Sequence, residues 1–331
     1  MRSTGRRLLA TLALCAVLIG LAAHPAGADT SLNGLFTDWP NLLPSVPNAN
    51  DPTNPDICAN GAYNCVDHTI KKMADAAAPL VQSCSDNAVF AMTYLRTTQT
   101  YEWARNQSGY FADTPWVNYE DAVFASFYFQ AYNGYYGTTQ NLSWVPQAWQ
   151  IAFNAADKHL VTASGNLLLG MNAHVNADLP VVLYEIGLVD GNGNSRKPDH
   201  EAVNRFLDAE LDPLLAEMAG RFDPSLSLPA TPYGLGDQAL MQLLVDWREN
   251  AWTEAQALAD APDAAARALV YNSIQASAAA EAQVLVQTDA YTPLGLGGET
   301  PASRYSYCQA HKYWRTNVAY PWGFPSSQTL S

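Results

Sequence analysis

Basic residues are scarce in this sequence. Among 331 residues, 17 lysines and arginines stand against 31 aspartates and glutamates, so the formal net charge is −14 at pH 7. Such a chain repels polyanions, which argues against general affinity for nucleic acid or for an anionic membrane surface. A local metal or basic pocket can still hold one phosphate group, so small anionic substrates are not excluded.

Long apolar runs are also scarce. After residue 28 no run is long enough to span a bilayer, so we expect no stable membrane insertion. The run that does stand out, "LLATLALCAVLIGLAA", follows three arginines and precedes the small residues Ala26–Ala28. This pattern predicts a secretory signal peptide over residues 1–28, with cleavage near Ala28. The mature protein is expected to be extracellular and monomeric.

Cysteine is limited to five residues, of which the predicted cleavage removes Cys15. The remaining spacings match neither a zinc ribbon nor a CxxC motif, which disfavours metal or redox roles. An even number of cysteines outside the cell indicates two disulfides, and three pairings are open. We favour a short loop, Cys58–Cys65, and a long-range bond, Cys84–Cys308, that ties the C-terminal tail to an early helix.

Segments that alternate with a period of two are few, which excludes a substantial β-sheet. Helical periodicity instead extends over residues 66–290, without an internal repeat or a linker. We predict an all-α domain over residues 65–331, a single bundle of about seven to nine helices. An irregular arm over residues 29–64 precedes it, and a coil tail begins at Pro293. Pro213 is expected to split or kink one helix.

One apolar segment, "LLLGMNAHVNADLPVVL", contains an unusual number of polar residues. Within seven positions it carries Asn172, His174, Asn176 and Asp178. On a helix, His174 and Asp178 share a face because they are four residues apart. Pro180 cannot donate a hydrogen bond to the carbonyl of Asn176, so the helix is expected to bend there.

Three interpretations of His174 and Asp178 remain open. In the first, they and the asparagines form a buried polar network that fixes helix packing. In the second, they are half of a site for a divalent metal such as zinc, and other helices supply the remaining ligands. In the third, Asp178 orients His174 as a metal-free general base.

A second unusual segment is "DWRENAW", in which Arg248 and Trp252 share a helical face. No acidic residue lies at a helical pairing distance from Arg248, so its partner must come from another helix or from a ligand. We expect Asp178, Glu185 or an anionic group of a substrate in that role. A set of aromatic residues at helical spacing forms either core or a ligand-stacking wall: Trp116, Tyr119, Phe124, Tyr128 and Tyr132. Our ligand-binding candidates are Asn172, Asn176, Glu185, Tyr128 and Trp252.

The motif "GMNAHVNADL" resembles the core GMNAH-[IV]-N-x-DL of a family of uncharacterised, largely helical proteins. The blocks "PQAWQIAF", "DHEAVNRFL" and "WRENAW" resemble other recurring blocks of that family, and the resemblance covers about residues 85–285. It implies a helical fold and no established reaction.

A looser similarity is to helical zinc-dependent phospholipases C and single-strand nucleases, which build a multi-zinc site from HxxxD pairs. This chain has one clear HxxxD pair, His174 and Asp178, and no Trp near the predicted mature N-terminus. The similarity therefore implies at most one or two metal positions, completed by a distant histidine or acid.

These observations favour a secreted hydrolase that acts on a small ester or phosphoester, with or without a bound metal ion. His174 and Asp178 would bind the ion or activate water, and Arg248 would hold an anionic group. One alternative is a binding protein that uses the aromatic wall to hold a small apolar or amphipathic ligand. Another is a structural protein whose polar helix only fixes packing. The sequence leaves open which of these applies, and whether the protein is an enzyme.

Overall fold

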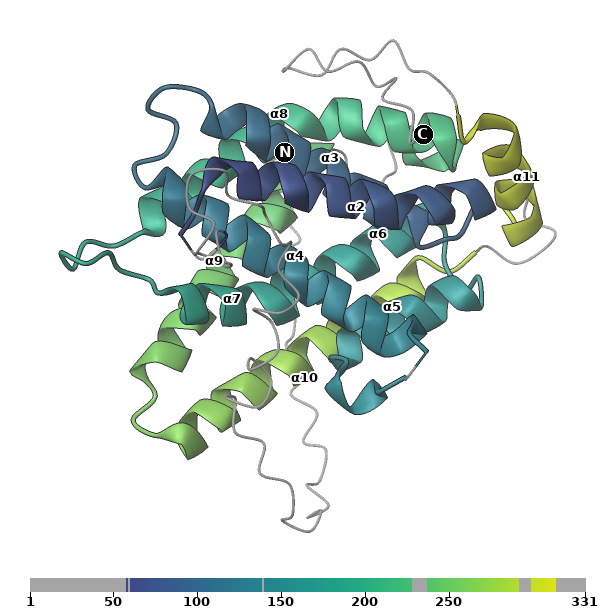
Figure 1. Ribbon diagram of the computed structural model, residues 1–331. Coiled ribbons are helices and arrows are strands. Elements are labelled where there is room, and N and C mark those ends of the chain that lie inside the picture. Colours follow the sequence, from purple (N-terminus) through teal and green to yellow (C-terminus); the bar gives the residue numbers. More distant parts are fainter. Residues whose placement is uncertain (1–57, 59, 139, 228–236, 292–298, 314–331) are drawn as a thin grey trace, which may run out of the picture.

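The computed structural model describes residues 58, 60–138, 140–227, 237–291 and 299–313. The predicted signal peptide and nearly all of the predicted arm lie outside this part. Within it the chain is helical and carries two isolated β-bridges but no sheet (Figure 1). The prediction of an all-α fold is therefore confirmed.

Ten α-helices make up most of the described part of the chain. In chain order they are α2 (Tyr63–Ser83), α3 (Ala88–Arg105), α4 (Thr114–Tyr136), α5 (Gln147–Asp157), α6 (Ala163–Met171), α7 (Leu179–Ile186), α8 (Lys197–Arg221), α9 (Asp237–Asp260), α10 (Ala264–Thr288) and α11 (Pro301–His311). Two short 3₁₀ helices, η2 (Leu142–Trp144) and η4 (Pro224–Ser227), lie between them, and a π-helix, η3 (Asn172–Asp178), joins α6 to α7.

The helices α6, η3 and α7 form one continuous helical segment, which we call the central helix. It contacts α3, α4, α5, α9 and α10, and Figure 1 shows α9 and α10 as a hairpin below it. Its sequence is apolar on nearly all sides, as expected for a helix surrounded by others. The polar run of residues 172–178 is therefore buried at the centre of the bundle.

The π-helix η3 lies where Pro180 interrupts the α-helical hydrogen bonds. The N–H of Leu179 donates to the carbonyl of His174, five residues back instead of four. The side chain of Gln275, from α10, donates to the carbonyl of Ala177 at 3.0 Å. The expected disturbance at Pro180 thus takes the form of a widened turn, supported by a neighbouring helix.

Local signals place several helix ends. Asp113 accepts a hydrogen bond from the N–H of Trp116, and Pro115 lies in the first turn of α4, both common features of a helix start. Gly170 lets α3 approach the central helix closely, because a Cβ at this position would lie 2.3 Å from Cδ2 of Phe90. This approach brings the aromatic side chains of α3 next to residues 172–178.

Of the split or kink predicted at Pro213, the split is wrong, because α8 continues through this residue. Buried contacts on both sides hold the helix together at the cost of one backbone hydrogen bond. Before Pro213, Glu210 accepts from Thr97 of α3 at 2.7 Å, and after it Glu217 accepts from Arg96 of α3 at 2.8 Å. Tertiary contacts with one neighbouring helix thus override the local propensity.

The predicted coil after Pro293 contains α11, which the sequence interpretation missed. Thr300 caps this helix: its hydroxyl accepts from the N–H of Ser303, whose own side chain accepts from the N–H of Thr300. Pro301 occupies the first turn, where a missing N–H costs nothing. Cys308 then bonds this helix to Cys84 at the end of α2.

Both favoured disulfides are confirmed. Cys58 and Cys65 are joined with 5.2 Å between their Cα atoms, and Cys84 and Cys308 with 5.9 Å. Across the described ranges, no helix is both long and apolar enough to cross a membrane.

A buried ion network joins α3 to α8. Glu217 accepts from Nε and Nη2 of Arg96 at 2.9 and 2.8 Å, and from Nε of Arg221 at 2.8 Å. Arg221 also donates to the carbonyl of Lys312, just after α11. All three charged side chains are buried, so the network lies in the region of low dielectric where pairing matters most.

Candidate functional site

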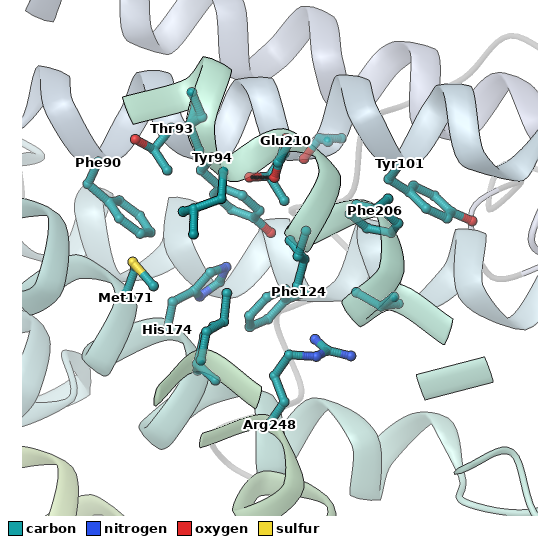
Figure 2. A pocket seen from close by; sticks show the side chains of 18 of the residues that line it. Phe90, Thr93, Tyr94, Tyr101, Phe124, Met171, His174, Phe206, Glu210 and Arg248 are labelled. Carbon is teal, nitrogen blue, oxygen red and sulfur yellow. Dashed lines mark hydrogen bonds between the residues drawn. The ribbon is translucent and has the colours of Figure 1, made fainter. Parts of the chain in front are cut away.

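A cavity of about 140 Å³ lies among α3, α4, α8, α9 and the central helix. Its lining is mostly apolar, and Figure 2 shows aromatic rings from α3, α4 and α8 around it. These rings are Phe90, Tyr94, Tyr101, Phe124 and Phe206. An engineered apolar cavity of about 150 Å³ in another protein stays dry and binds benzene, so this space suits a molecule of about that size.

Asp178 fixes the orientation of His174 at the edge of this cavity. Its Oδ2 lies 2.9 Å from Nδ1 of His174 and accepts from Nε1 of Trp149, on α5, at 2.8 Å. Burial raises the pKa of Asp178, and the hydrogen bonds from His174 and Trp149 oppose this effect. With Asp178 ionised, its oxygen accepts from both groups and Nδ1 carries the imidazole proton. The other ring nitrogen, Nε2, is then an acceptor with a free lone pair.

Aromatic rings hold His174 on several sides. It stacks on Phe124 with 3.5 Å between ring centroids and an interplanar angle of 1°, and it meets Tyr94 edge-on at 4.6 Å. The residue is 2% exposed. Burial lowers the pKa of His174, although the hydrogen bond to Asp178 opposes this effect, so the imidazole is neutral at pH 7.

Nε2 of His174 is buried and has no hydrogen-bond partner among the described residues. Buried acceptors without a partner are uncommon in folded proteins and often mark a functional position. Because His174 lines the cavity, this atom is available to a molecule placed there. The π-helix contributes directly, since it is the element that carries both His174 and Asp178.

Three carboxyl groups line the same cavity, namely Glu120 and Asp121 on α4 and Glu210 on α8. Burial raises the pKa of Glu120 to about 7, of Asp121 to about 8 and of Glu210 to about 7. Glu210 is satisfied by the hydroxyls of Thr97 and Thr100. In contrast, Oε2 of Glu120 and Oδ2 of Asp121 are buried without a hydrogen-bond partner in the described part of the chain.

The sequence interpretation missed these carboxyl groups. Acids in a helix usually lie on its solvated face, and spacing alone gives no reason to place these three in the interior. A usable signal exists for α4, where Glu120 and Asp121 interrupt the aromatic run "WVNYEDAVFASFYF". No comparable signal marks Glu210.

Arg248 lines the same cavity, as Figure 2 shows. Its Nε donates to Oδ1 of Asn204 at 2.8 Å and its Nη2 to the carbonyl of His200 at 2.7 Å, while Nε2 of His200 lies 3.0 Å from the carbonyl of Arg248. Burial lowers the pKa of Arg248 to about 10, and the charge of Glu120 opposes this. Arg248 thus bonds to neutral groups of α8, not to Asp178 or Glu185 as expected.

The remaining sequence candidates lie outside the cavity lining. Asn172 donates to the carbonyl of Ala278 at 2.8 Å, and Asn176 donates to Asn172 and to Glu281, so both asparagines face α10. The asparagines thus form a polar network with α10, whereas Asp178 bonds to His174 and Trp149, so the first interpretation holds for the asparagines alone.

Two aromatic candidates and one acid are also separate from the cavity. Tyr128 packs behind Phe90, with 5.4 Å between ring centroids, and Trp252 packs against His200 at 5.3 Å. Glu185 is exposed on α7. The structure therefore brings His174 and Arg248 to one cavity, with Asp178 behind His174.

As for the metal hypothesis, the described residues contain no group of three or more His, Cys, Asp or Glu side chains placed to hold a metal ion. Within the pair itself, Nδ1 of His174 and Oδ2 of Asp178 already bond to each other. What the arrangement offers chemically is one acceptor nitrogen, oriented by a carboxylate, at the wall of an apolar space.

Comparison with known proteins gives one result. Residues 66–288 match DUF5995, described as a family of unknown function. No curated protein matches the chain, and no solved structure matches it.

Proposed function

Since the chain belongs to DUF5995, a family of unknown function, we propose a function from its geometry: the protein binds a small, mostly apolar molecule in the cavity. The observation that carries this proposal is the unpartnered Nε2 of His174 within an aromatic wall. A ligand hydroxyl or amine donates to this nitrogen, and the rest of the ligand replaces water against the rings. Such pockets combine apolar walls with a few oriented polar groups.

The affinity follows from the size of the cavity. A ligand of benzene size buries roughly 200 Å² of apolar surface, which is worth about 5 kcal/mol. The costs of association reduce this value, so we expect dissociation constants of about 1 mM for simple aromatic probes. A larger natural ligand buries more apolar surface and therefore binds more tightly.

Benzyl alcohol and toluene test this proposal by ligand-observed NMR on the full-length mature protein. We expect both probes to bind the wild type. His174→Leu is expected to weaken the binding of benzyl alcohol about tenfold and to change the affinity for toluene less than about threefold. Leucine fills most of the space and removes the acceptor. His159→Leu, at a half-exposed histidine outside the cavity, is the control and is expected to change neither value. Failure of both probes to bind the wild type at millimolar concentration contradicts the proposal.

We further propose that the protein is exported and monomeric. The two disulfides and the N-terminal sequence pattern support export. Native mass spectrometry of the exported protein measures the mature mass, the oligomeric state and any co-purified ligand in one experiment. A mass that includes residues 1–28 contradicts the proposed cleavage and export, and the mass of a dimer contradicts the monomeric state.

A second candidate function is metal-free hydrolysis of a small ester, favoured by the hydrogen bond between His174 and Asp178. In this reaction Nε2 takes a proton from water as the water oxygen bonds to the carbonyl carbon, and the proton then passes to the departing alcohol. Arg248 holds an anionic group where the substrate has one. The sequence similarity to zinc-dependent phospholipases C contributes no step to this mechanism.

For this second candidate, Asp178→Asn is expected to lower the turnover of phenyl acetate at least about 100-fold, because an amide no longer fixes the imidazole proton on Nδ1. His174→Ala is expected to abolish turnover. Glu185→Gln, an exposed change on α7, serves as the control. Initial rates by absorbance check this, and wild-type turnover no faster than that of His174→Ala rejects the hydrolase.

A further inference from the structure

Six buried polar atoms of the cavity lining have no hydrogen-bond partner among the described residues. Three are hydroxyl groups, of Thr93, Tyr94 and Thr98, which can donate or accept, and the other three belong to His174, Glu120 and Asp121. Nε2 of His174, Oε2 of Glu120 and Oδ2 of Asp121 are buried, and the first is an acceptor, as are both oxygens when the carboxyls ionise. All three residues line the cavity. For the acceptors of His174, Glu120 and Asp121, the best complement is a group with several donors and no acceptor.

We propose that the occupant of the cavity is a small organic amine in its protonated form, with an apolar body of about benzene size. This inference rests on the proposed binding function and names its ligand class. An ammonium group has three donors and no acceptor, whereas a hydroxyl has one donor and a carboxylate has none. With three donors, an ammonium group can bond to more of the acceptors of His174, Glu120 and Asp121 than a hydroxyl or a carboxylate can.

The charges around the cavity favour a cation. Three carboxyl groups line it, Glu120, Asp121 and Glu210, against one lining cation, Arg248. Arg248 already donates to Asn204 and to His200. A bound cation therefore meets an excess of carboxyl groups in a region of low dielectric, where charge pairing is strong.

Two groups of α3 favour the ionised form of Asp121, namely the charge of Arg105 and the side chain of Thr98, which can donate a hydrogen bond to it. Arg105 donates to the carbonyl of Tyr63 and to Asp67, and its Nε is buried without a hydrogen-bond partner among the described residues. Glu102, also on α3, adds negative charge, as does Glu120 beside it. The other charges that act on Glu120 are Arg248 and Asp199, and the oxygens of Asp199 accept from the N–H groups of Ala112 and Asp113.

The aromatic wall suits the same ligand. The rings of Tyr94, Phe124 and Tyr101 line the cavity and offer their faces or edges to an apolar body. Aromatic faces also attract organic ammonium groups, by about 0.5–2 kcal/mol each. The cavity thus combines apolar volume, aromatic surface and unsatisfied carboxyl oxygens within one site.

The proposal implies a definite dependence on pH. In the empty cavity the carboxyls of Glu120 and Asp121 titrate near neutrality, and a bound ammonium group favours their ionised form. Binding of the amine releases protons, so affinity rises as the pH increases from 6 to 8. An alkylammonium group keeps its own proton across this range.

The test compares three isosteric probes, benzylamine, benzyl alcohol and benzoate, by calorimetry on the full-length mature protein at pH 6 and pH 8. At pH 8 we expect benzylamine to bind about tenfold or more tightly than benzyl alcohol, and benzoate to bind most weakly. From pH 6 to pH 8 the affinity for benzylamine should increase about tenfold, whereas the affinity for benzyl alcohol should stay the same.

Substitutions of the two carboxyl groups test whether they cause the preference for benzylamine. Glu120→Gln combined with Asp121→Asn should reduce the preference for benzylamine to about threefold or less. The matched control, Glu185→Gln with Glu201→Gln, removes the same charge from two exposed sites and should keep the full preference. If benzyl alcohol binds as tightly as benzylamine in the wild type, the amine proposal is wrong while the cavity proposal stands. If no probe binds, both are wrong, and neither result depends on whether a variant folds.

Discussion

Replacing Cys84 and Cys308 with alanine is expected to lower the free energy of unfolding by about 5 kcal/mol. The bond joins residues 224 positions apart, so it closes nearly the whole folded domain into one loop. In the unfolded state this closure removes many conformations, and the entropy gained by opening it grows with the logarithm of loop length. Urea titration followed by circular dichroism measures the change.

The other disulfide provides the matched control. Cys58 and Cys65 are seven positions apart, for which the same relation gives about 2–3 kcal/mol. Replacing this pair with alanine should therefore cost about half as much. Equal losses from the two double variants would show that loop closure is not the source of stability, and would point to native contacts around the cysteines.

Replacing Glu217 with alanine is expected to cost about 3–5 kcal/mol. The carboxylate is fully buried and accepts hydrogen bonds from Arg96 and Arg221, which are themselves buried. Its removal leaves two guanidinium groups without their main counter-charge in the interior. Burying unpaired charge is among the most expensive changes in a folded protein. The same urea titration measures this loss.

An exposed ion pair serves as the control for Glu217. Lys71 and Asp75 lie one turn apart on α2 with 2.7 Å between their charged atoms, and both side chains are largely exposed. Asp75→Ala is expected to change the free energy of unfolding by less than about 0.5 kcal/mol, because solvent screens this pair. Comparable effects of the two substitutions would contradict the role assigned to burial.

Much of the fold could be predicted because its signals are local. Helical periodicity, the lack of alternating segments and the cap at Asp113 all act within a few residues. Two errors arose where local signals compete with distant ones. Pro213 lies within α8 because α3 holds the helix on both sides of it, and α11 is a helix in a tail rich in Gly, Pro and Tyr.

The candidate site could be predicted only where its contacts lie within one helix. The hydrogen bond between His174 and Asp178 follows from their spacing of four residues, which the sequence displays. The contacts of Asp178 with Trp149 and of Arg248 with Asn204 depend on how helices cross, which no local spacing encodes. The buried carboxyls, such as Glu210, were missed because an acid in a helix gives no sign of which neighbour covers it.

The π-helix also changes the phase of the sequence pattern. A π-turn holds about one residue more than an α-turn, and each residue of an α-helix advances the side chains by about 100°. Counted along the sequence, the residues of α7 therefore face a direction that differs by about one residue, or 100°, from that of an uninterrupted α-helix. In this orientation Val182 and Leu183 are buried and Glu185 is exposed. A chain one residue shorter between Asn172 and Asp178 could continue α6 into α7 as an α-helix in the same register, so the π-turn is how the bundle accommodates one added residue and gains the site that carries His174 and Asp178.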